Sequence, residues 1–71
     1  MYIPFKANDS DGNIHHLRVE YANTDETLSN MLRVVDRMEQ PVQFNRSVHG
    51  IGRFVLQDGT KLDSNDKYSP T

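Results

Sequence analysis

Two runs of alternating apolar and polar residues, 2–7 and 14–22, constrain the fold more than any other feature of the sequence. A period of two is typical of a strand that buries one face. The apolar members of the runs are Ile3, Phe5, Ala7, Leu17, Val19 and Tyr21. Residues 8–13 between the runs are Asn, Asp, Ser and Gly, which are residues that form turns. The sequence therefore predicts a β-hairpin at the start of the chain.

The segment after this hairpin has the pattern of an amphipathic helix. Its apolar residues follow the spacing of one helical stripe. They are Leu28, Met31, Leu32, Val35 and Met38. Asn23 or Thr24 can cap the start, and Pro41 ends the helix near residue 39 or 40. The spacing predicts a helix of about four turns.

A second hairpin is expected after the helix. Residues 42–45 and 53–57 predict strands, and Asp58-Gly59 predicts a two-residue turn. In that register Val55 and Leu62 face the core, whereas Phe54 and Leu56 face outward. The chain is therefore predicted to be α+β, a ββαββ antiparallel sheet with one helix on one face. Residues 1–62 form this single domain, and residues 63–71, which lack periodicity, form a flexible tail.

Size and charge exclude several classes of protein. The chain has 71 residues, no cysteine and a net charge of -2. Disulfides and thiolate zinc sites are excluded, and the weakly acidic charge makes the chain a poor generic polyanion binder, because that class needs clustered positive charge. No run approaches the roughly 20 apolar residues of a membrane span, and the first residues lack a secretory signal pattern. A cytoplasmic protein without a membrane contact is expected.

Candidate catalytic and metal sites fail on their spacing. Aligning Gly12 with the glycine of a calcium loop puts Ala7 and Arg18 at positions that need oxygen ligands. His15 and His16 are adjacent on a strand and so point to opposite faces. Ser47 and His49 lack a third group to orient the histidine. We therefore expect no enzyme, no metal and no cofactor.

One segment combines basic and apolar residues. Arg46, His49 and Arg53 surround two glycines, and Phe54 and Leu56 follow them. Arginine and aromatic anchors are typical of protein interfaces. We predict that these five residues contact another protein, with the acidic turn at Asp9 and Asp11 as the alternative surface. The alternative function is a nucleic-acid-binding regulatory accessory that uses Arg46 and Arg53, although the net charge opposes it.

The layout of residues 2–62, with its capped helix at Thr24 and its Asp58-Gly59-Thr60 turn, supports a comparison with known proteins. It is similar in size and order to small α/β proteins carried by phages and mobile elements, among them some anti-CRISPR inhibitors. Small bacterial accessory proteins that dimerise through a sheet share this outline. The resemblance implies an inhibitor or adaptor and assigns no functional residues. Because one helix covers one face of a sheet, outward-facing Phe54 and Leu56 also predict a homodimer.

Overall fold

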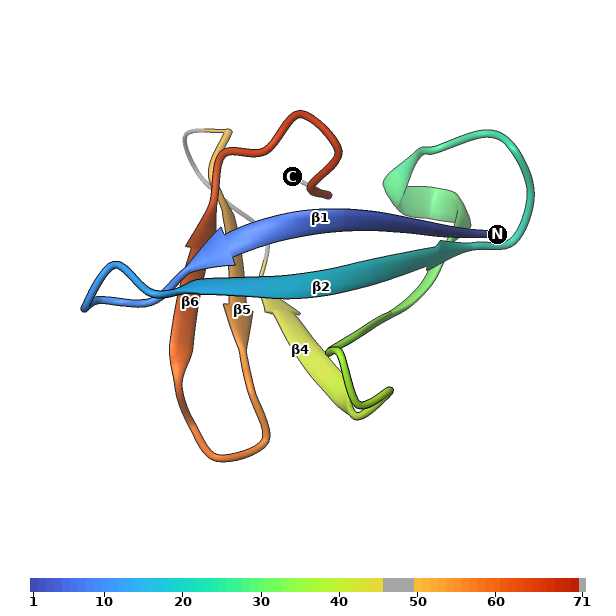
Figure 1. Ribbon diagram of the computed structural model, residues 1–71. Helices are drawn as coiled ribbons and strands as arrows, with labels where there is room; N and C mark the ends of the chain where they lie inside the picture. The colour runs from blue at the N-terminus through green and yellow to red at the C-terminus, as the bar shows by residue number, and fades with distance from the viewer. Residues whose placement is uncertain (46–49, 71) are drawn as a thin grey trace.

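The structure is a computed structural model that describes residues 1–45 and 50–70. Antiparallel strands follow one another in sequence order around a closed barrel (Figure 1). The strands are β1 (Tyr2–Asn8), β2 (Ile14–Tyr21), β3 (Met31–Val35), β4 (Pro41–Asn45), β5 (Gly52–Val55) and β6 (Lys61–Ser64). A 3₁₀ turn, η1 (Leu28–Asn30), lies in the loop between β2 and β3. Across the residues that the structure describes, no helix is long and apolar enough to span a membrane.

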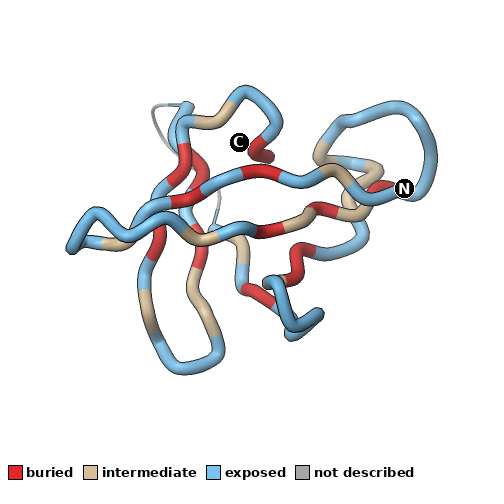
Figure 2. The backbone as a smooth tube through the Cα atoms, viewed as in Figure 1, coloured by how far each residue is buried: buried red, intermediate tan, exposed pale blue. Residues whose placement is uncertain are grey.

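The first hairpin is confirmed. β1 pairs with β2 from Tyr2↔Glu20 to Asn8↔Ile14. The inward-facing residues are those that the alternation predicts, and burial alternates along both strands in Figure 2. The two strands form the longest ribbon of the barrel, and they supply half of its interior.

The predicted helix is wrong, and so is the α+β class. Residues 31–35 form β3, which pairs with β2 on one side and with β4 on the other. Val34 and Val35 are β-branched and favour a strand. Leu32 and Met38, which the helical stripe places in the core, are 60% and 78% exposed. Helix propensity is a weak preference that tertiary contacts override. Here the pairing of β3 with β2 and β4 completes an all-β barrel.

Turns with one shared hydrogen-bond pattern join the strands in pairs at one end of the barrel, which we call the turn end. Each spans five residues, 9–13, 36–40 and 56–60. The first residue donates its N–H to the fifth carbonyl, and the fourth donates to the first carbonyl. The fourth residue has a positive φ in every case: Gly12 at 83°, Glu39 at 62° and Gly59 at 90°. This is the three-residue hairpin loop, a type I turn followed by a left-handed residue.

The register of the second hairpin differs from the prediction for this reason. The two-residue turns that are common in hairpins need a positive φ at the first central position, and Asp58 does not have it. The longer loop pairs Phe54 with Leu62 and Val55 with Lys61. Phe54 therefore points inward and is 1% exposed. The prediction that Phe54 faces outward is wrong. The homodimer was predicted from an uncovered apolar sheet face that contained Phe54, and this argument for it no longer holds.

The core fills the barrel and is centred on Phe54. Its ring centroid lies 5.1 Å from that of Phe5 and 5.5 Å from that of Phe44. These tilted ring pairs join β1, β4 and β5 across the interior. The remaining members of the buried cluster are aliphatic or small, except for one tyrosine: Ala7, Leu17, Val19, Tyr21, Val34, Val42 and Leu62.

The seam between β1 and β6 is closed largely by side chains. The two strands pair at Asn8↔Asp63. Beyond that pair, the Ser64 hydroxyl donates to the Lys6 carbonyl, and the Lys6 N–H donates to the Asp66 carboxylate at 3.0 Å. β6 thus continues to Ser64, two residues beyond the predicted domain boundary at 62. The chain after it turns back across the barrel.

Residues 65–70 pack against β5 at Gly52. Ser69 and Pro70 are buried. A Cβ atom at position 52 would lie 2.6 Å from the Pro70 carbonyl oxygen and 2.6 Å from the Ser69 hydroxyl. Such a contact is too short for any side chain, so this close approach requires glycine.

Candidate functional site

Of the five predicted partner-binding residues, the structure describes three, and these three lie in different surroundings. Arg46 and His49 lie outside the described residues. The Arg53 side chain is 66% exposed, and its Nε lies 3.8 Å from the Asp63 carboxylate on the neighbouring strand. Phe54 is in the core, where it can touch no partner. Leu56 is half-buried and packs against the core from the start of the turn 56–60.

Leu56 lies in a hollow at the turn end that also contains apolar residues from the two other hairpins. Ile14, 59% exposed, and Met38, 78% exposed, line the same hollow. Its volume is about 240 Å³, and Leu17 also lines it. Arg37, Asp36, His15 and His16 complete the lining. Exposed apolar residues that gather inside a polar rim mark interaction sites more often than single exposed residues do.

The turn 36–40 holds Met38 in place. The Asp36 carboxylate accepts hydrogen bonds from the N–H groups of Met38, at 2.8 Å, and Gln40, at 2.9 Å. These bonds fix the backbone on both sides of the exposed thioether. Methionine is flexible and polarisable, so a fixed backbone with a mobile side chain suits an adaptable contact.

The turn 9–13 positions Ile14 in a similar way. Asp9 accepts from the N–H groups of Asp11, at 2.9 Å, and Asn13, at 3.0 Å, through one carboxylate oxygen. Its other oxygen accepts from the Asn13 amide and from His15 Nε2, at 3.2 and 3.0 Å. The Asp9 carboxylate is therefore occupied by its own turn, and Ile14 follows this turn at the start of β2.

The acidic side chains around the hollow are engaged in hydrogen bonds, whereas the arginine at its rim is not. The hydrogen bond from His15 is the largest cause that lowers the pKa of Asp9, to about 2. The pKa of Asp58 is also lowered, chiefly by hydrogen bonds from Thr60, with a smaller contribution from His15. Asp36 is engaged by backbone N–H groups. Among the described residues, Arg37 makes no hydrogen bond or ion pair, so its guanidinium is the free charge at the rim.

The geometry at the turn end supports binding. No three of the histidines, aspartates and glutamates in residues 1–45 and 50–70 gather where they could hold a metal ion. The acidic turn at Asp9 and Asp11, the alternative contact surface, belongs to the same end of the barrel. What the site can do is receive an apolar side chain beside a cation.

The sequence predicts a contact at Leu56 and none at Ile14 or Met38, which line the same hollow. Met38 was assigned to the buried stripe of a helix. A signal was present: residues 9–13 read DSDGN and residues 36–40 read DRMEQ, and both place Asp first and an amide last. That likeness would have predicted a second hairpin turn, with Met38 at its tip.

Comparisons with known proteins identify no relative. No protein-family model matches the chain, and neither a curated protein nor a solved structure matches it.

Proposed function

We propose that the chain is a non-enzymatic, cytoplasmic module that binds another protein through the hollow at the turn end. The observation that carries the proposal is the gathering of Ile14, Met38 and Leu56 in one hollow. A partner would insert an apolar side chain between these three residues and place a carboxylate against Arg37. Inhibitors and adaptors act in this way, because they occupy a surface without changing a bond.

Several features support a protein as the partner. The apolar residues come from separate hairpins, each fixed by its turn, so the surface is preorganised and loses little entropy on binding. Arg53, the described residue of the predicted basic patch, faces Asp63, which offsets its charge toward a phosphate. The absence of cysteine fits a reducing compartment.

The experiment is a quantitative pull-down from the source cells with Met38→Glu. We expect capture of the specific partner to fall about tenfold or more, since a charge replaces an apolar contact at the centre of the surface. The matched control is Leu32→Glu, which changes an exposed apolar residue of β3 outside the hollow. Circular dichroism verifies that both variants fold.

A partner captured equally by the wild type, Met38→Glu and Ile14→Glu contradicts this surface. Arg53→Glu belongs in the same series because the sequence predicts a contact there. Loss of the partner with Arg53→Glu alone would move the contact to the β5–β6 face. Loss with Met38→Glu alone would assign it to the turn end.

A further inference from the structure

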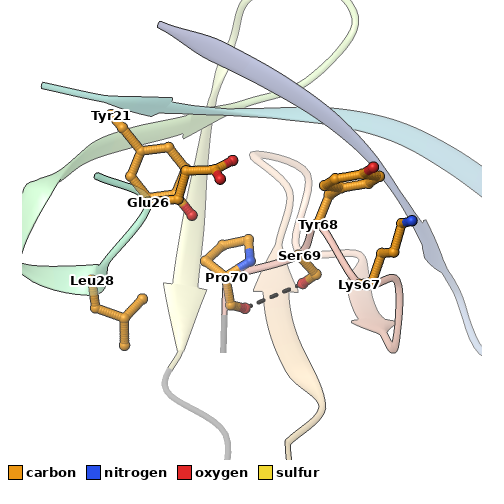
Figure 3. Close-up of a pocket in the computed structure, with 7 residues that line it drawn as sticks. All are labelled: Tyr21, Glu26, Leu28, Lys67, Tyr68, Ser69 and Pro70. Atoms are coloured by element: carbon orange, nitrogen blue, oxygen red, sulfur yellow. Dashed lines mark hydrogen bonds between the residues drawn. The ribbon is translucent and has the colours of Figure 1, made fainter. Parts of the chain in front are cut away.

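A second cleft lies outside the proposed protein-binding surface, at the end of the barrel opposite the turns. It has a volume of about 550 Å³, within the range of small-molecule sites. One wall comes from the end of β2 and the loop after it, with Tyr21, Glu26 and Leu28. The other comes from the C-terminal segment, with Lys67, Tyr68 and Pro70 (Figure 3).

The Tyr21 hydroxyl is an unused polar group in this cleft. Tyr21 is 5% exposed, and no hydrogen bond to its hydroxyl exists among the described residues. No buried side-chain oxygen or nitrogen in residues 1–45 and 50–70 lacks a partner. The hydroxyl is therefore open to the cleft, whose lining also includes Glu26 (Figure 3). A buried ring with an accessible polar tip is ready to accept a bond from a ligand.

Charges of opposite sign stand on the two walls. Within the part of the chain that the structure describes, the Glu26 carboxylate makes no hydrogen bond or ion pair. The carboxylate gives this wall its negative charge. Burial, and then the charge of Glu26, raise the pKa of Tyr21, so the Tyr21 hydroxyl stays neutral. On the other wall, the Lys67 ammonium lies 4.9 Å from the centre of the Tyr68 ring and makes no direct ion pair among the described residues, and its charge helps to lower the pKa of the adjacent Asp66.

We propose that this cleft binds a small zwitterion with an apolar side chain, the chemical class of the free aliphatic α-amino acids. The ammonium group of the ligand donates to the Glu26 carboxylate and to the Tyr21 hydroxyl oxygen. Its carboxylate pairs with Lys67, and its side chain contacts Leu28 and Pro70. A simple amine would meet repulsion from Lys67, and a simple acid would meet repulsion from Glu26, so the two walls together select a molecule that carries both charges.

The experiment is an NMR titration of the ¹⁵N-labelled protein with three probes that share the same isobutyl group. The probes are L-leucine, 3-methylbutylamine, which lacks the carboxylate, and 4-methylpentanoate, which lacks the amine. We expect L-leucine to give saturable shifts at the amides of Tyr21, Tyr68 and Ser69. The other two probes should bind about tenfold more weakly or more, because each leaves one charged wall unpaired.

Variants then assign the roles. Glu26→Gln and Tyr21→Phe should each weaken L-leucine binding, Glu26→Gln by about tenfold or more. The matched control is Asp25→Asn, the same change of charge one residue away and outside the cleft lining, which should leave the affinity unchanged. Lys67→Gln should bring the affinity for L-leucine down to that for 3-methylbutylamine.

Three results would overturn the proposal: no saturable shift with L-leucine, equal affinity for L-leucine and the amine in the wild type, or equal effects of Glu26→Gln and Asp25→Asn. The Met38→Glu variant should still bind L-leucine normally. Failure of the cleft and failure of the turn-end surface can therefore be distinguished.

Discussion

The turns 9–13 and 36–40 have one geometry and two very different sequences. Both begin with an aspartate whose carboxylate accepts the N–H groups of the third and fifth residues. Both place a left-handed residue fourth. In the first turn that residue is Gly12, for which a positive φ is unstrained, and in the second it is Glu39, for which it is strained.

The difference shows what makes a turn visible in a sequence. Asp-Gly between two alternating runs indicates a hairpin directly. Residues 36–40 contain no glycine, and the apolar residues around them have helical spacing. The same turn is therefore not predicted from the sequence. The hydrogen bonds to the Asp36 carboxylate and the pairing of β3 with β4 hold Glu39 in its strained conformation. Local preference therefore forms the first turn, and tertiary structure imposes the second.

The largest effect is expected from substitutions in β3, the strand before the turn 36–40. They test whether this segment is a strand or a helix. Val34 is 2% exposed and faces the core, and Leu32 is 60% exposed. Val34→Asp should unfold the protein, because an unpaired buried charge costs several kcal/mol against a total stability of about 5 kcal/mol for a small domain. Leu32→Asp should change the free energy of unfolding by less than about 0.5 kcal/mol.

Circular dichroism with urea titration measures both variants. A helix would give a different result, because Leu32 belongs to the helical stripe and would be buried. A folded Val34→Asp together with an unfolded Leu32→Asp would contradict the barrel.

A smaller effect should follow from exchanging the left-handed residues of the two turns. Glu39→Gly should stabilise the protein by about 0.5–1 kcal/mol, since it relieves the strained φ. Gly12→Ala should destabilise it by about 1 kcal/mol. No atom lies within 4 Å of a Cβ built at Gly12, so the loss is conformational and not steric.

Thermal melts at several urea concentrations measure these changes. Glu39→Ala is the control, because it removes the exposed ion pair with Arg18 Nη2, at 3.3 Å, and keeps the strain. That pair contributes little on its own. Equal stabilisation by Glu39→Ala and Glu39→Gly would show that strain at position 39 is absent.

The smallest effect should be on the pH dependence of the first turn. The hydrogen bond from His15 and those from the turn lower the pKa of Asp9 from 3.8 to about 2. A carboxyl with a lowered pKa stabilises the folded state above its unfolded pKa. This stability is lost as the pH falls from about 4 through about 2. The thermal midpoint of the wild type should fall in this window, and that of Asp9→Asn should fall less.

The pKa values of Asp58 and Asp66 are also lowered, so a residual slope should remain in Asp9→Asn. An identical slope in the wild type and in Asp9→Asn would mean that Asp9 does not couple folding to pH.

The parts of the fold that could be predicted are those fixed by neighbours in sequence. Both strands of the first hairpin, their faces and the strand at 42–45 follow from a period of two. The segment 28–38 could not be assigned, because its apolar spacing fits a helix and its burial is set by pairing with distant strands. The predicted orientation of Phe54 is wrong because the turn is one residue longer than predicted. Asp-Gly occurs in both two-residue and three-residue loops, so these two residues alone do not determine the length of the turn.

The site was less predictable than the fold. The sequence predicts a contact at Leu56 because it is an apolar neighbour of Arg46, His49 and Arg53. Ile14 and Met38 join it only when the three turns meet at one end of the barrel, and no local pattern carries that information. The predicted contact around Arg53 and Phe54 rested on the residue types that are common in interfaces, whereas the structure pairs Arg53 with Asp63 and buries Phe54.

The seam between β1 and β6 has a consequence for how the chain folds. Its side-chain bonds join residues 58 and 60 positions apart, Ser64 to Lys6 and Asp66 to Lys6. Closing a loop of that size costs more entropy than closing a short turn, and this cost must be met before the contacts at the seam compensate for it. The hairpin of β1 and β2, by contrast, closes over a five-residue turn. Folding should begin at this hairpin and finish at the seam, so the barrel is completed when the two ends of the chain meet.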